Sequence, residues 1–91
     1  MRTEFSEWLS SMVQSRIDVF PEPELSRIRA SLDQGEPRLA AHQLLWWMFE
    51  DESVPAMTKS EAKMALIYNE RGWFGTGVRK HIASVISPLV A

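Results

Sequence analysis

The segment PRLAAHQLLWWMFE, residues 37–50, decides the fold of this chain. It begins with Pro37, which suits the first position of a helix because the N–H that proline lacks would have no partner there. From Leu39 to Phe49 the segment is nearly continuously apolar, and a helix that is apolar on most sides is usually central in a domain. A buried strand over residues 44–49 is the alternative, but the proline start and the length favour a helix.

Two helical segments are predicted before this one. The first runs from about Thr3 to Val19, and its apolar stripe at helical spacing consists of Phe5, Trp8, Leu9, Met12, Val13 and Ile17. Its end is predicted at residues 21–23, PEP, because a proline pushes the preceding residue out of helical geometry. The second runs from about Pro23 to Gln34, and Gly35 supplies the left-handed residue that ends it.

Two further helices are predicted after an acidic loop at residues 51–57. Thr58 and Glu61 form a capping box, in which each side chain satisfies an exposed amide of the other residue, and Gly72 marks the end of that helix. The last helix is expected from about Thr76 to Ser87. The sequence therefore predicts an all-α fold, a compact bundle of about five short helices that forms a single domain over residues 1–91.

Composition limits the class of protein. The chain has 91 residues, of which 45% are hydrophobic and 24% are charged, and both fractions are ordinary for a globular domain. It has no cysteine, so disulfides and thiolate metal sites are excluded. No run approaches the roughly 18 apolar residues of a membrane span, and the first residues carry acids where a signal peptide would be basic and then apolar. We expect a cytoplasmic protein with no membrane contact.

The charge is unevenly distributed along the chain. Residues 1–61 hold 11 acids and 6 bases, a net charge of −5, whereas residues 62–91 hold 1 acid and 4 bases, a net charge of +3. The overall net charge of −2 argues against a general nucleic-acid binder, which usually has a strongly basic face. A protein-binding module with an acidic side stays open.

The candidates for chemistry are few. Neither His42 nor His81 has a second histidine three or four residues away, and a metal site usually needs three or four ligands, so both are predicted to be surface or boundary residues. The stretch from Gly75 to Gly77 lacks the spacing of a phosphate-binding loop and is better explained as a turn before a helix. No nucleophile with a base, and no pair of carboxylates, can be placed. We expect neither an enzyme nor a cofactor.

An acidic cluster, Glu50-Asp51-Glu52, follows the third helical segment. Three acids at the C-terminal end of a helix oppose the local dipole, and such local costs are commoner at functional sites. Two interpretations stay open at this point. The cluster is either a solvated loop or an electrostatic docking site for a basic partner.

The adjacent tryptophans Trp46 and Trp47 point about 100° apart on a helix. Trp47 shares a face with Ala40 and Leu44 and is the better core candidate, whereas Trp46 is expected at a rim or on an exposed patch. An exposed tryptophan beside acids has the composition of a binding hot spot. Two core tryptophans are the alternative.

The middle of the chain contains PEPELSRI at residues 21–28, DQGEPRLA at 33–40, Leu44 and Leu45, FED at 49–51, Val54-Pro55 and TKSE at 58–61. These stretches resemble the small helical immunity proteins of the MafI type, which belong to bacterial polymorphic and contact-dependent toxin systems. The resemblance covers about residues 20–67. It departs from the family at the two tryptophans, whose positions are usually more polar, and it does not extend from Tyr68 onward.

The resemblance implies an antitoxin that binds the toxic C-terminal domain of a secreted effector, often a nuclease. Nucleases need basic surfaces for the phosphate backbone, and an acidic inhibitor associates quickly with such a surface. The oligomeric state stays open, with a monomer or a heterodimer with the toxin favoured, and no direct contact to nucleic acid is expected. The predicted partner-binding residues are Glu36, Trp46, Glu50, Asp51 and Glu52.

Two other functions stay open. A helical nucleic-acid-binding or regulatory domain would use the basic C-terminal segment, with Arg71, Arg79, Lys80 and His81. A scaffold or dimer subunit would use the additional aromatic residues as an interface between copies.

Overall fold

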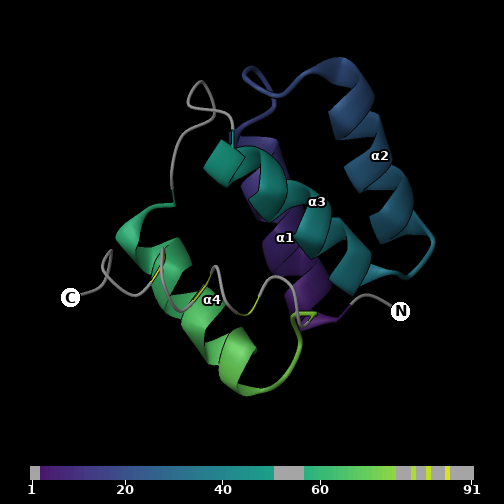
Figure 1. Cartoon of the computed structure of the whole chain (residues 1–91). Helices are drawn as coiled ribbons and strands as arrows, with labels where there is room; N and C mark the ends of the chain where they lie inside the picture. The colour runs from purple at the N-terminus through teal and green to yellow at the C-terminus, as the bar shows by residue number, and fades with distance from the viewer. Residues whose placement is uncertain (1–2, 51–56, 76–78, 80–81, 83–85, 87–91) are drawn as a thin grey trace. The chain divides into compact units, whose positions relative to one another are not determined.

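The computed structural model describes residues 3–50 and 57–75, together with residues 79, 82 and 86. Its four α-helices in that part of the chain are α1 (Glu4–Ser15), α2 (Glu22–Asp33), α3 (Pro37–Glu50) and α4 (Lys59–Glu70) (Figure 1). The all-α prediction is confirmed for these residues, with four helices where about five were expected. The predicted fifth helix falls mostly outside the described residues. None of the described helices is long and apolar enough to cross a membrane.

The chain divides into two compact units, which we call unit 1 (Met1–Pro55) and unit 2 (Ala56–Ala91). Unit 1 contains α1, α2 and α3, and unit 2 contains α4. A single domain over residues 1–91 stays a prediction.

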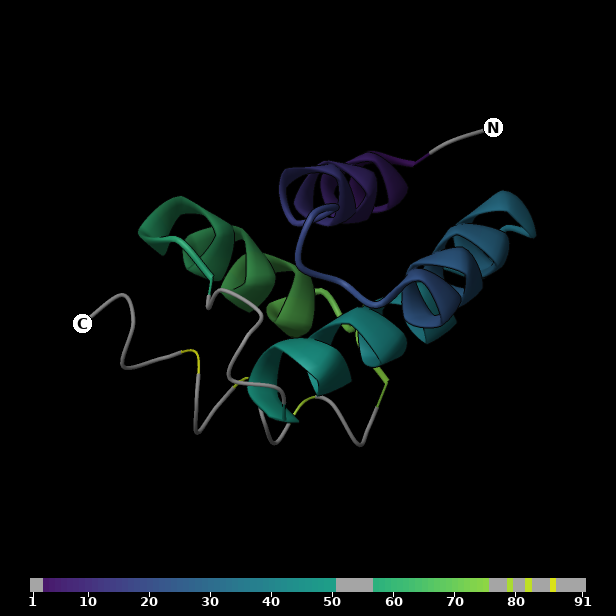
Figure 2. The same cartoon turned by 90° about the horizontal axis from the view of Figure 1, so that it is seen from above.

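In unit 1, α3 packs against both α1 and α2. Seen from above, the three helices lie around a common centre (Figure 2). The apolar run of residues 37–50 forms a helix, so the strand alternative for residues 44–49 is wrong. The buried residues of the three helices include Phe5, Leu9, Met12, Val13, Leu25, Ile28, Ala40, Ala41, Leu44, Leu45 and Met48.

Helix α1 ends at Ser15, four residues earlier than the sequence predicts. Beyond this point the chain forms tight turns with hydrogen bonds between residues three apart. The amide of Arg16 donates to the carbonyl of Val13 at 3.1 Å, and the amide of Val19 donates to the carbonyl of Arg16 at 3.1 Å. These turns bury Phe20, which is 6% exposed, and leave Val19 exposed. Helix α1 therefore ends early because of packing, which the helical periodicity of the sequence does not reveal.

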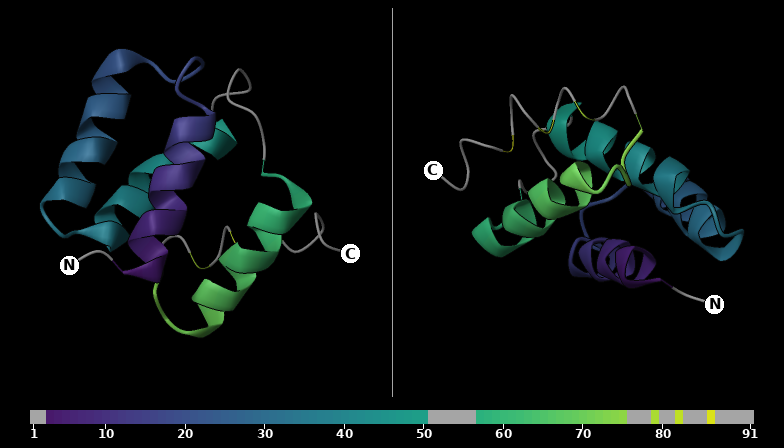
Figure 3. Two further views of the ribbon diagram at one scale, coloured as in Figure 1. Left: turned by 180° about the vertical axis from the view of Figure 1, so that it is seen from behind. Right: turned by 90° about the horizontal axis from the view of Figure 1, so that it is seen from below.

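Helices α2 and α4 end in the same way. Gly35 and Gly72 have φ angles of 74° and 76°, the left-handed conformation that glycine adopts at low cost. The amide after Gly35 donates to the carbonyl of Ser31 at 2.9 Å, and the amide after Gly72 donates to the carbonyl of Tyr68 at 3.1 Å. Both glycines end a helix, as predicted, and the hydrogen bonds form a Schellman motif at each end. A short turn joins α2 to α3 (Figure 3).

In unit 2, α4 begins at the predicted capping box. The hydroxyl of Thr58 accepts from the amide of Glu61 at 3.1 Å, and the Glu61 carboxylate accepts from the amide of Thr58 at 2.9 Å. The buried side of the helix carries Ala62, Ala65 and Tyr68. The ring of Tyr68 stacks on Trp73 with 5.2 Å between centroids, so the turn after the helix is held against it.

Candidate partner-binding surface

An exposed line of side chains runs along α3. Leu39 is 46% exposed and Trp46 is 52% exposed, and Glu50 is exposed at the end of the helix. The spacing of i, i+7 and i+11 places the three on one side of a helix. We call Leu39, Trp46 and Glu50 the α3 face. It combines two large apolar side chains with a carboxylate.

The sequence of α3 explains why this face is left in solvent. Its buried residues already occupy the sides that meet α1 and α2. A second tryptophan next to these positions has no room in the core, so Trp46 projects outward and stacks on His42 with 6.2 Å between ring centroids. The alternative of two core tryptophans is therefore wrong.

Trp47 lies partly buried beside α2 and not in the core. Its indole Nε1 donates to Glu24 Oε2 at 3.0 Å. The same oxygen accepts from Arg27 Nη1 at 3.3 Å. The polar edge of the ring is satisfied by a carboxylate of the neighbouring helix, which explains why this tryptophan stays at the rim.

The two tryptophans border an open pocket of about 400 Å³ between α2 and α3. On the same helix as the two rings, Gln43 Oε1 accepts from Ser31 Oγ of α2 at 2.9 Å, which fixes the side-chain amide. Such a surface offers aromatic area together with hydrogen-bonding groups, which is typical of residues that anchor a protein partner. The lining residues are Glu24, Arg27, His42, Gln43, Trp46 and Trp47.

The predicted site residues are brought together in part. Trp46 and Glu50 share the α3 face, one helical turn apart. Glu36 is exposed just before α3, and its carbonyl accepts from the amide of Ala40 at 3.1 Å. Because α3 has 14 residues, Glu36 and Glu50 lie roughly 20 Å apart at opposite ends. The remaining predicted contacts, Asp51 and Glu52, lie outside the described residues.

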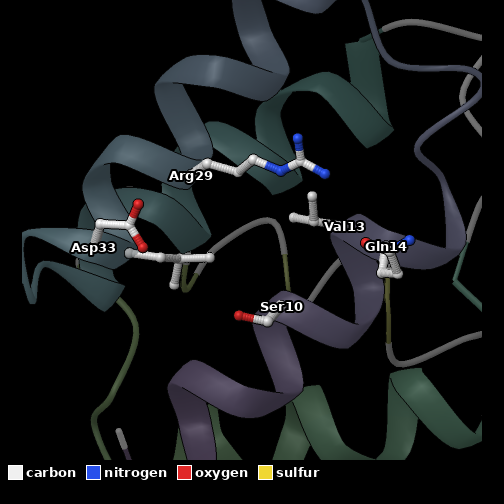
Figure 4. Close-up of a pocket in the computed structure, with 6 residues that line it drawn as sticks. Ser10, Val13, Gln14, Arg29 and Asp33 are labelled. Atoms are coloured by element: carbon white, nitrogen blue, oxygen red, sulfur yellow. The ribbon is translucent and has the colours of Figure 1, made fainter. Parts of the chain in front are cut away.

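A second pocket, of about 320 Å³, lies between α1 and α2, and the sequence does not predict it (Figure 4). Its polar residues come in pairs four apart, Ser10 with Gln14 on α1 and Arg29 with Asp33 on α2. The spacing is visible in the sequence, but nothing there indicates that the two pairs face one another. Val13 and Leu32 complete the lining.

The two units differ in charge. Unit 1 has 10 acids and 5 bases and unit 2 has 2 acids and 5 bases, so their net charges are −5 and +3. The charge asymmetry of the sequence therefore follows the division into compact units. The α3 face belongs to the acidic unit.

Metal ligands do not gather in the described part of the chain, where no three acidic or histidine side chains form a candidate site. His42 is exposed, as predicted. His81 lies outside the described residues.

No protein-family model matches this chain, and neither a curated protein nor a solved structure does. The resemblance of residues 20–67 to MafI-type immunity proteins therefore stays a prediction. The chemistry of the α3 face is the remaining basis for a functional proposal.

Proposed function

We propose that this protein is an immunity protein that binds and neutralises the toxic C-terminal domain of a secreted bacterial effector. The toxin domain would carry a basic surface, as a nuclease does, and the two would meet in the cytoplasm. The proposal makes the protein a binder and not an enzyme. Trp46 and Glu50 would contact the toxin directly.

The observation that carries the proposal is the exposed tryptophan of the α3 face. Trp46 has 52% of its surface in solvent, and a partner could bury that surface. Tryptophans are enriched among interface hot spots. Glu50 follows Trp46 by one turn, at the edge where a cationic side chain of a partner would remain partly hydrated.

The charge of unit 1 supports a basic partner. A net charge of −5 attracts a basic surface over about one Debye length, roughly 8 Å at physiological ionic strength. Such attraction raises the association rate more than the final affinity. Added salt is therefore expected to slow association without abolishing the complex.

The proposal predicts that a gene beside this one encodes a secreted toxin, and the direct test is protection of bacteria that express the toxic domain of that protein. The full chain is expected to restore growth and to co-purify with the toxin domain. Trp46→Ala is expected to weaken the complex about 30-fold, which corresponds to the roughly 2 kcal/mol of a hot spot.

Val19→Ala is the matched control, because Val19 is 39% exposed and lies in the segment between α1 and α2, outside α3. It is expected to bind and protect like the natural chain. Absence of protection and of co-purification with the neighbouring toxin would overturn the proposal. If both variants weakened toxin binding equally, the α3 face would not be the contact surface.

The basic charge of unit 2 favours a second candidate, a nucleic-acid-binding domain. Arg71 and Arg79 are exposed there, although the Arg71 guanidinium already lies 5.8 Å from the Trp73 ring centroid. Lys80 and His81 lie outside the described residues. Binding of duplex DNA that weakens with salt, with a slope reduced by about one when Arg79 is replaced by alanine, would support this function. Absence of DNA binding at low salt would exclude it.

A further inference from the structure

Three of the large apolar side chains that are exposed among the described residues lie on helices, two on α3 and one on α4. Ile67 of α4 is 40% exposed, beside the 46% and 52% of Leu39 and Trp46. Exposed apolar side chains are common when they stand alone. These are informative because of the charges that flank them.

On α4, Ile67 lies in line with two lysines. Lys59, Lys63 and Ile67 follow one another at intervals of four residues, and all three are exposed. Residues four apart are neighbours on a helix surface. We call this set the α4 face. Neither lysine has an ion pair within the described part of the chain.

The two faces carry their groups in opposite order along the chain. On the α3 face the apolar Trp46 precedes the acidic Glu50 by four residues. On the α4 face the basic Lys63 precedes the apolar Ile67 by four residues. Two antiparallel helices that bring Trp46 against Ile67 therefore also bring Glu50 against Lys63, and their helix dipoles are opposed favourably.

We propose that the protein associates with a second copy of itself, through the α3 face of one copy and the α4 face of the other. Charge complementarity selects this occupant, because the α3 face belongs to the unit of net charge −5 and the α4 face to the unit of net charge +3. The contact covers exposed apolar side chains from both helices. A second copy is present wherever the protein is made.

Self-association does not require a toxin, so it is tested with the purified full chain alone. Sedimentation is measured over a range of micromolar concentrations, at low and high salt. The average mass is expected to rise above the monomer mass with concentration, because each copy offers both faces, and to fall with salt, because exposed ion pairs are screened. A monomer at every concentration would overturn the proposal.

Charge reversal tests the pairing itself. Glu50→Lys places a lysine opposite Lys63, and Lys63→Glu places a glutamate opposite Glu50, so each variant alone is expected to associate at least about tenfold more weakly. An equal mixture of the two is expected to regain association, since the reversed glutamate of one copy meets the reversed lysine of the other. A mixture that stays as weak as its components would contradict the antiparallel pairing.

Apolar variants test the other half of the contact. Trp46→Ala and Ile67→Ala are both expected to lower the average mass, whereas Val19→Ala is the matched exposed control that leaves it unchanged. All three positions are at the surface, so helical content measured by circular dichroism is expected to stay constant. If Ile67→Ala had the same average mass as the natural chain at every concentration, the α4 face would not take part in the contact.

Because Trp46 and Glu50 are also the proposed toxin contacts, self-association and toxin binding would exclude one another. Lys63→Glu separates the two proposals, since Lys63 is not a proposed toxin contact. This variant is expected to lose self-association and to keep protection against the toxin. If the natural chain does not protect against the toxin, only the proposed immunity function is overturned. If the average mass does not rise with concentration, only the proposed self-association is overturned.

Discussion

Helices α3 and α4 have similar lengths, 14 and 12 residues, but they are stabilised by different means. α3 has five buried side chains and lies against two neighbouring helices, so its stability depends on packing. α4 begins with a capping box and ends at a left-handed glycine, so hydrogen bonds mark both of its ends. Because α4 also buries Ala62, Ala65 and Tyr68, the comparison shows that the two helices differ in the number of side chains that they bury and in the hydrogen bonds that mark the ends of α4.

The same difference affects what each helix exposes. Helix α3 has more apolar side chains than its buried sides can hold, so Leu39 and Trp46 of the α3 face are left exposed. The polar sequence of α4 leaves lysines and a single large apolar side chain, Ile67, in solvent. Mutations can test whether packing and end signals have the separate roles that this comparison assigns to them.

The largest effect is expected from loss of packing in α3. Leu44 is 0% exposed, and Leu44→Ala removes buried methyl groups and leaves a cavity, so the free energy of unfolding should fall by about 3 kcal/mol. Urea unfolding followed by circular dichroism measures this loss. Leu39→Ala is the matched control on the same helix, and its exposed side chain should cost under about 1 kcal/mol. Similar losses for both would refute the division of α3 into a buried and an exposed side.

A smaller effect is expected at the end of α4. Gly72 has a φ of 76°, and a methyl group added there would meet no other atom within 4 Å, so Gly72→Ala should cost only the backbone strain of about 1–2 kcal/mol. Gly75→Ala is the control, because it has equal space and no positive φ, and it should leave the thermal midpoint nearly unchanged. Equal midpoints for the two variants would contradict the role of Gly72 as an end signal.

The start of α4 gives the next effect in size. Thr58→Ala removes the hydroxyl that accepts from the Glu61 amide, which should cost about 1 kcal/mol, whereas Thr58→Ser keeps the acceptor and should cost little. Amide exchange of the first turn of α4 measures the loss locally. Ser60→Ala is an exposed control in the same turn. Faster exchange in the serine variant, equal to that in the alanine variant, would show that the hydroxyl does not cap the helix.

Much of this fold could be predicted from local signals. The start of α3, the capping box of α4 and the two terminal glycines are predictable because proline, threonine and glycine act on their immediate neighbours. Helical periodicity alone predicts that α1 continues to Val19. The helix ends at Ser15 instead, and the turns that follow bury Phe20. Those turns depend on packing between segments, which a single sequence does not record.

The candidate site shows the same limit. The sequence leaves the exposure of Trp46 as one of two alternatives, because two adjacent tryptophans point about 100° apart on a helix and both can be buried only if the helix is enclosed, and the structure decides for exposure. The grouping of the acids could not be predicted, since Glu36 and Glu50 are separated by the full length of α3. The pocket between α1 and α2 depends on how two helices meet, so its residues have no signal beyond their spacing in each helix.

The smallest predicted effect distinguishes the two tryptophans of α3. Trp47→Phe removes the indole donor to Glu24, and the free energy of unfolding should fall by about 1 kcal/mol. The Glu24 side chain is 19% exposed, so water can replace part of the lost bond and limits the cost. Trp46→Phe alters a ring that is 52% exposed and should change stability by under about 0.5 kcal/mol. If Trp46→Phe proved the more destabilising of the two, Trp46 would contribute to the packing of α3 and could not serve as a free contact for a partner.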